Sequence, residues 1–158
     1  MITAEAEIGA LVDAETAAWN ARDANALVSL FHPDTVWPWP PDSAAHDPMQ
    51  WVMPFGRFDR ERWRCSWQAL FDTHDLVHNR RETLRIVVSE QGDGAFAVVD
   101  VDTLWSNRTT KQLFHWKGRA CKGYTKVRQG CSSSTRGSWT TKGDHEIPRL
   151  ISCDGSAR

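Results

Sequence analysis

The segment ETLRIVVSEQGDGAFAVVDVDTLW, residues 82–105, has the clearest strand pattern in the chain. Apolar and polar side chains alternate on both sides of a glycine-rich turn, which is typical of two antiparallel strands joined as a hairpin. A turn centred on Gly92 and Asp93 places Leu84 opposite Val101. The sequence therefore predicts a long β-hairpin with one apolar face.

A third strand is predicted at residues 113–127, after a polar turn. If Trp105 lies beside Phe114, then Asp100 faces Arg119, and one sheet face is apolar while the other carries charges. The remaining predicted pairs are Ile86 with Val99, Val88 with Ala97, Arg85 with Asp100, Thr83 with Asp102, Thr103 with Trp116, Val101 with Gly118 and Asp102 with Lys117. Consistent pairing on both faces supports this register.

Three helices are predicted before the strands. Thr3 can cap the first helix, Asp23 the second over residues 24–31, and Asp59 the third. Inward stripes at helical spacing are formed by Ile8, Leu11, Val12, Glu15 and Trp19 in the first helix and by Trp63, Trp67, Leu70 and Phe71 in the third. Helices that precede an antiparallel sheet indicate an α+β architecture, with the helices packed on one sheet face.

The segment between the second and third helices is irregular. Residues 35–39, TVWPW, are predicted as a strand at a sheet edge, because Pro38 cannot take part in a central ladder. Four more prolines lie between residues 40 and 56. A loop of this length in a compact domain is more often functional than accidental.

Composition narrows the class of protein. A chain of 158 residues suits one domain, and 19 Lys and Arg against 20 Asp and Glu leave no basic footprint for nucleic acid or an anionic membrane. No apolar stretch is long enough to span a bilayer, so we expect a cytoplasmic protein. The four cysteines are widely spaced, which argues against a zinc cluster and for unpaired thiols.

The order of elements and the residues resemble a known family. The segments AAWNARDANALVSLFHPDTVWPWP, RFDRERWRCSWQALFDTHD, ETLRIVVSE, GAFAVVDVDTLW and HWKGRACKGYTKV resemble the SnoaL-like branch of the nuclear transport factor 2-like superfamily. That superfamily includes ketosteroid isomerase, scytalone dehydratase, limonene epoxide hydrolase and polyketide cyclases. The resemblance implies a cone-shaped α+β barrel, in which three N-terminal helices pack on a strongly curved antiparallel sheet. It also implies a ligand site on the concave face and a homodimer formed through the convex face.

The C-terminal part departs from that family. We expect one domain over residues 1–130 and an atypical tail, rich in Ser, Gly and Thr, over residues 131–158. Two interpretations stay open. Residues 131–141 pair as a weak final strand, or the reading frame shifted near Arg128 and the tail is foreign to the fold.

Polar residues of the first strand are the leading catalytic candidates. Extending the face of Leu84 backward in steps of two points Glu82, Arg80 and His78 into the cone. His78 would then be a general acid or base, Glu82 its partner, and Arg80 the anchor for a substrate oxygen. The alternatives are that the strand has left the core and the three side chains meet solvent, or that a bulge reverses the face.

Two strand carboxylates and a histidine are expected on the other face. The predicted register places Asp100, Asp102 and His115 on the convex side. Arg119 and Lys117 would neutralise the carboxylates there, so we expect structural roles, with catalysis by the carboxylate pair as the alternative.

The long loop adds His46 and Asp47, which would overhang the mouth of the cone in a gating or acid–base role, or simply as solvated residues. The sequence contains no nucleophile motif, no phosphate-binding loop and no histidine spacing for a metal. We therefore expect neither a cofactor nor a metal, and any chemistry would depend on proton transfer.

Nine tryptophans against one tyrosine are unusual. Such rings fill cores, yet rigid indoles also leave gaps that suit a flat apolar molecule. The predicted ligand contacts are Trp19, Trp37, Trp39, Trp67, Trp105 and Trp116, with His46 from the loop. We expect an acid–base enzyme of the isomerase, cyclase, dehydratase or hydrolase type, acting on a small hydrophobic ring or polyketide-like substrate. The alternative is a protein that binds or carries such a molecule without converting it.

Overall fold

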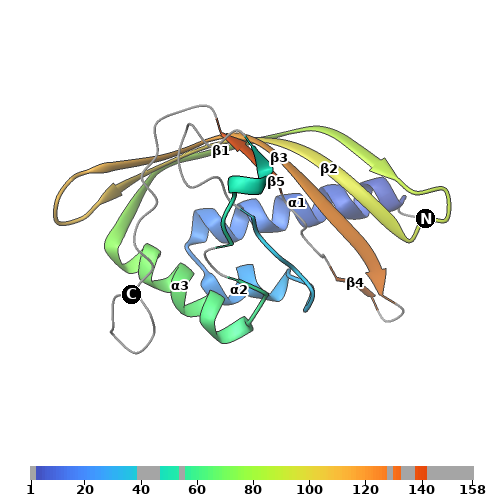
Figure 1. Ribbon diagram of the computed structural model, residues 1–158, viewed down its shortest axis with the longest axis horizontal. Coiled ribbons are helices and arrows are strands. Elements are labelled where there is room, and N and C mark those ends of the chain that lie inside the picture. The colour runs from blue at the N-terminus through green and yellow to red at the C-terminus, as the bar shows by residue number, and fades with distance from the viewer. Residues whose placement is uncertain (1–2, 39–46, 54–55, 128–129, 133–137, 142–158) are drawn as a thin grey trace.

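A curved antiparallel sheet lies across one side of the molecule, and three helices lie under its concave face (Figure 1). The computed structural model describes residues 3–38, 47–53, 56–127, 130–132 and 138–141. The strand order is β1-β2-β3-β4, and β5 also pairs with β3. This arrangement is the α+β cone that the sequence predicts.

Each helix begins where its cap is predicted. The elements are α1 (Ala4–Ala21), α2 (Ala24–Ser29), a 3₁₀ turn η1 (Pro48–Gln50) and α3 (Arg60–Thr73). The side chains of Thr3, Asp23 and Asp59 each accept a hydrogen bond from an amide of the first turn that follows. Among the described residues, no helix has the length and apolar character needed to cross a membrane.

The strand predicted at residues 35–39 is reduced to a single bridge between Val36 and Arg57, and Trp39 lies outside the described residues. The other strands are β1 (His74–Val88), β2 (Gly94–Asn107), β3 (Leu113–Val127), β4 (Gly130–Ser132) and β5 (Ser138–Thr141). Both short strands pair with β3, and the two interpretations of the C-terminal segment both stay predictions.

The β2–β3 register is the predicted one, with Trp105 opposite Phe114. The β1–β2 register is displaced from the prediction by two residues, since Ile86 lies opposite Ala97. The position of the hairpin loop causes this displacement of the register. It closes between Ser89 and Gly94, where the Ser89 hydroxyl accepts a hydrogen bond from the amide of Gly94 at 3.1 Å.

A β-bulge in β1 has a larger consequence. The register shifts between Thr83 and Arg85, so Leu84 is the extra residue and the two faces of β1 are exchanged beyond it. Arg81 consequently lies opposite Val101 on the inner face. The residues left on the outer face are His78, Arg80 and Glu82. The expectation that these three point into the cone is therefore wrong.

Tryptophans fill the space between the helices and the sheet. The indole of Trp19 meets those of Trp67 and Trp116 edge to face, with ring centroids 4.8 and 5.5 Å apart. Trp63 packs in the same way against Phe31, at 5.4 Å. We call the buried indoles the aromatic core: Trp19, Trp37, Trp63, Trp67, Trp105 and Trp116. Large rigid rings of this kind contribute much of the apolar area that holds α1 and α3 on the sheet.

Candidate functional site

A charge cluster is buried between α1 and the sheet. Glu15 Oε1 accepts a hydrogen bond from Arg81 Nη1 at 2.8 Å, and Glu15 Oε2 accepts one from the Lys122 ammonium. Trp19 Nε1 also donates to Glu15 Oε1, at 3.3 Å. The side chains of Glu15, Arg81 and Lys122 are only 6%, 2% and 2% exposed. We call these three residues the inner charge cluster.

Three elements bring the inner charge cluster together. Glu15 belongs to the inward stripe of α1, one turn before Trp19. Lys122 shares the inner face of β3 with Tyr124, because side chains alternate along a strand. Arg81 faces inward only because of the bulge at Leu84. A local irregularity in one strand therefore completes the cluster.

Burial and charge act in opposite directions on these groups. Burial alone raises the pKa of Glu15, but the charges of Lys122 and Arg81 outweigh it and hold the pKa at about 2. Burial lowers the pKa of Lys122 to about 8, although the carboxylate of Glu15 opposes this shift. The Lys122 amine can therefore exchange its proton close to neutral pH, while Glu15 stays ionised.

Asn79 fixes the position of Arg81. Its side-chain oxygen accepts hydrogen bonds from Arg81 Nε at 3.2 Å and from the Thr103 hydroxyl at 2.7 Å. Its amide nitrogen donates to Asn20 Oδ1 at 3.0 Å, which ties β1 to α1. The guanidinium carbon of Arg81 also lies 5.6 Å from the ring centroid of Trp19, within cation–π range.

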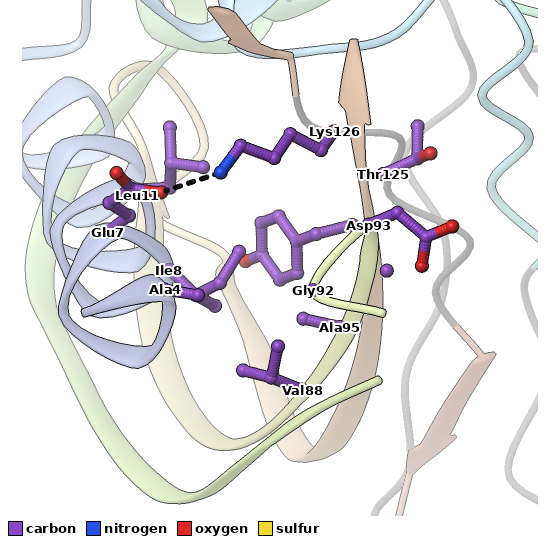
Figure 2. A pocket seen from close by; sticks show the side chains of 12 residues that line it. Ala4, Glu7, Ile8, Leu11, Val88, Gly92, Asp93, Ala95, Thr125 and Lys126 are labelled. Atoms are coloured by element: carbon purple, nitrogen blue, oxygen red, sulfur yellow. Dashed lines mark ion pairs between the residues drawn. The ribbon is translucent and has the colours of Figure 1, made fainter. Parts of the chain in front are cut away.

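A pocket lies between α1, the β1–β2 hairpin and β3 (Figure 2). It encloses only about 20 Å³, room for about one water molecule, and its apolar lining comes mainly from Ala4, Ile8, Leu11, Val88, Ala95 and Tyr124. Glu7 and Lys126 also line it, and their ion pair of 3.9 Å connects α1 with β3. Small-molecule sites usually enclose roughly 300 Å³ or more, so a ligand here would lie mostly in the open groove above this lining.

Tyr124 connects this pocket with the inner charge cluster. It lines the pocket, is 6% exposed, and lies two residues from Lys122 on the same strand face. Burial raises the pKa of Tyr124 and the charge of Glu15 raises it further, so the phenol stays protonated. Within the part of the chain that the structure describes, its hydroxyl has no hydrogen-bond partner. A hydroxyl in this state is available to a polar atom of a ligand.

The predicted site residues lie elsewhere. Arg80 and Glu82 are exposed on the outer face, and His78 hydrogen-bonds there to Asp102. Asp47 is exposed, and its carboxylate accepts a hydrogen bond from the amide of Met49 at 2.9 Å. His46 lies outside the described residues.

The predicted ligand-contacting tryptophans pack mainly against one another. The five that the structure describes, namely Trp19, Trp37, Trp67, Trp105 and Trp116, all belong to the aromatic core, and none of them lines the pocket in Figure 2. Their contact with a ligand stays a prediction. The residues that sequence reasoning missed had a visible signal, because Glu15 and Lys122 are charged residues at inward positions of a helix and a strand.

A second cluster lies on the outer face of the sheet. Nε2 of His78 and Nε2 of His115 both hydrogen-bond to Asp102 Oδ1, at 2.6 and 2.8 Å. These hydrogen bonds, that of His78 first, lower the pKa of Asp102. One ligand atom from each residue lies within 4.8 Å of the other two, a grouping that can hold a metal ion. Spacing along the sequence gives no indication of it, because the three residues come from three strands.

Solved structures identify the architecture. A ketosteroid isomerase-like protein from Erwinia carotovora atroseptica superposes with a TM-score of 0.63 at 18% identity, over 87% of this chain and 97% of that chain. A nuclear transport factor 2-like superfamily protein from Salmonella enterica superposes with a TM-score of 0.60 at 15% identity, over 88% and 92%. The chain has the nuclear transport factor 2-like fold. A protein provisionally named scytalone dehydratase, from Novosphingobium aromaticivorans, shares this fold with a TM-score of 0.63 at 14% identity, over 96% and 93%.

No family model and no curated protein sequence matches the chain. At the identities of the solved structures the likeness concerns the fold alone, and the nuclear transport factor 2-like fold hosts many activities. Function therefore has to be argued from the pocket and the inner charge cluster.

Proposed function

We propose that the protein binds a small, largely apolar molecule with one polar group in the pocket that Tyr124 lines, and that it catalyses proton transfer on that molecule. The observation behind the proposal is the Tyr124 side chain, which lines the pocket, is only 6% exposed and keeps its phenol protonated. Lys122, with a pKa of about 8, lies two residues before it on the same face of β3. A phenol can polarise a substrate oxygen, and an amine that titrates near neutrality can give or take a proton.

Each part of the site has a task in this mechanism. The apolar side chains of Ile8, Leu11 and Val88 contact the body of the ligand. The Tyr124 hydroxyl donates a hydrogen bond to a carbonyl, hydroxyl or epoxide oxygen. Lys122 exchanges the proton, while Glu15 holds the amine in place. The neighbours named ketosteroid isomerase-like and scytalone dehydratase support ring compounds as the first ligands to test.

The test is a thermal-shift screen with steroids, polyketide fragments and terpenoid epoxides, followed by incubation of each hit in D₂O and mass spectrometry. A ligand of the native state raises the melting temperature, and proton transfer to carbon incorporates deuterium. We expect Tyr124→Phe to weaken binding about tenfold, the loss of one hydrogen bond. We expect Lys122→Met to abolish deuterium incorporation.

Lys117→Met is the matched control, because Lys117 is an exposed lysine of the same strand. It should bind and exchange as the wild type does. Binding without any conversion or exchange in the wild type would support a carrier instead of an enzyme. A set of hits whose melting shifts do not depend on Tyr124 would contradict the pocket assignment.

A further inference from the structure

We propose that His78, Asp102 and His115 form a binding site for a divalent transition-metal ion, such as Zn²⁺, on the outer face of the sheet. The pocket and the inner charge cluster lie on the opposite face, so this proposal does not depend on the proposed function. We call the three residues the outer triad.

The donor set of the outer triad suits such an ion. Two imidazole nitrogens and one carboxylate oxygen are ligands that Zn²⁺ and its neighbours in the first transition row prefer. The triad comes from three adjacent strands, His78 from β1, Asp102 from β2 and His115 from β3. Leu104 lies opposite both histidines in the register, so the two rings stand on either side of the same residue of β2. Strands hold these donors more firmly than a loop would.

The donor atoms already converge. Both Nε2 atoms point at Asp102 Oδ1, and the two rings lie 6.0 Å apart at an interplanar angle of 85°. Metal–ligand distances of about 2.1 Å place tetrahedral ligand atoms about 3.4 Å apart. The present separations of Oδ1 from the two nitrogens are 2.6 and 2.8 Å. Side-chain movements of roughly 0.6 to 0.8 Å therefore make room for an ion.

The triad is also accessible. Its side chains are 27%, 28% and 37% exposed, so an ion can enter from solvent and water can complete its coordination. Three protein ligands and an open position are the usual arrangement of catalytic zinc sites. Lys117 Nζ lies 3.6 Å from Asp102 Oδ2, the carboxylate oxygen that neither histidine contacts, and so leaves Oδ1 to the metal.

Two titrations test the proposal on metal-free protein that carries Cys121→Ser, because Cys121 is an exposed thiol. Calorimetry with ZnCl₂ should show one ion bound per chain. Addition of CoCl₂ should give the visible absorption typical of Co²⁺ with a low coordination number. Loss of a residue that only hydrogen-bonds to a metal ligand typically weakens metal binding about 10- to 100-fold. We expect a larger loss from each of His78→Gln, His115→Gln and Asp102→Asn, together with loss of the cobalt absorption.

Asp100→Asn is the control, because Asp100 lies two residues away on the same face and pairs with Arg119 instead. It should leave zinc affinity unchanged. Melting curves of the metal-free variants establish that each is folded. The proposal is overturned if the wild type binds no zinc at one ion per chain, if the triad variants retain full affinity, or if Asp100→Asn weakens binding as much as they do.

Discussion

On each face of the sheet a carboxylate lies between two nitrogen-bearing side chains, but one face is buried and the other is open to solvent. On the inner face Glu15 lies between Arg81 and Lys122, and water is almost excluded from all three. On the outer face Asp102 lies between two imidazoles and is 28% exposed. Asp100, also on that face, is 42% exposed. The two carboxylates therefore differ far more in solvent exposure than in their hydrogen-bond partners. We expect solvent exposure to determine how much each carboxylate contributes to the free energy of unfolding.

The largest effect is expected from Glu15→Gln. This change leaves the charges of Arg81 and Lys122 buried without an anion, which typically costs about 3–5 kcal/mol. Urea unfolding measures the loss. The double variant Glu15→Gln with Lys122→Met should regain part of the stability, because it removes one of the two buried cations that have lost their anion. A loss no larger than that of Asp102→Asn would contradict the comparison.

The stability of the protein should depend on pH through the titration of Glu15. The pKa of Glu15 in the folded protein is about 2, below the ordinary value of 4.5 for a glutamate. Its contribution is therefore fully present above pH 4.5 and is lost as the pH falls from 4.5 toward 2. Urea unfolding across this range should show a steeper decline for the wild type than for Glu15→Gln. Parallel curves would indicate that the pKa of Glu15 is the same in the folded and the unfolded chain.

An intermediate effect is expected from Asp102→Asn in metal-free protein. Its two hydrogen bonds to His78 and His115 are half-exposed, so their loss should cost about 1–2 kcal/mol. The lowered pKa of Asp102 has the same sign as that of Glu15, so this contribution also disappears on acidification. Thermal unfolding in the presence of a chelator measures it. A cost equal to that of Glu15→Gln would mean that exposure does not matter here.

The smallest effect is expected from Asp100→Asn. Asp100 pairs with Arg119 on an open surface, where water replaces the lost contact, so the melting temperature should not change measurably. A clear loss of stability would indicate that this face is covered in solution, as in the homodimer that the family resemblance implies. Sedimentation of the wild type would then measure the association directly.

Much of the fold could be predicted because its signals are local. The caps at Thr3, Asp23 and Asp59 and the β2–β3 register depend on neighbouring residues and on alternation along a strand. The convex placement of Asp100 and Asp102 followed from that register and is confirmed.

The candidate site could not be predicted as well, because one residue reverses a face. The bulge at Leu84 carries no composition signal, yet it turns Arg81 inward and His78 outward. The inner charge cluster also needs α1 docked on the sheet, which brings Glu15 to Lys122 across 107 residues of sequence. Such contacts follow from packing rather than from any motif.

The packing of the aromatic core also affects the ultraviolet circular dichroism of the protein. Indoles as close as those of Trp19 and Trp67, 4.8 Å between centroids, have coupled electronic transitions. The ultraviolet circular dichroism of the folded chain should therefore contain an exciton contribution from tryptophan in addition to the signal of its helices and strands. A helix content calculated from that spectrum will be distorted, while the exciton band itself will report directly on whether the core is assembled.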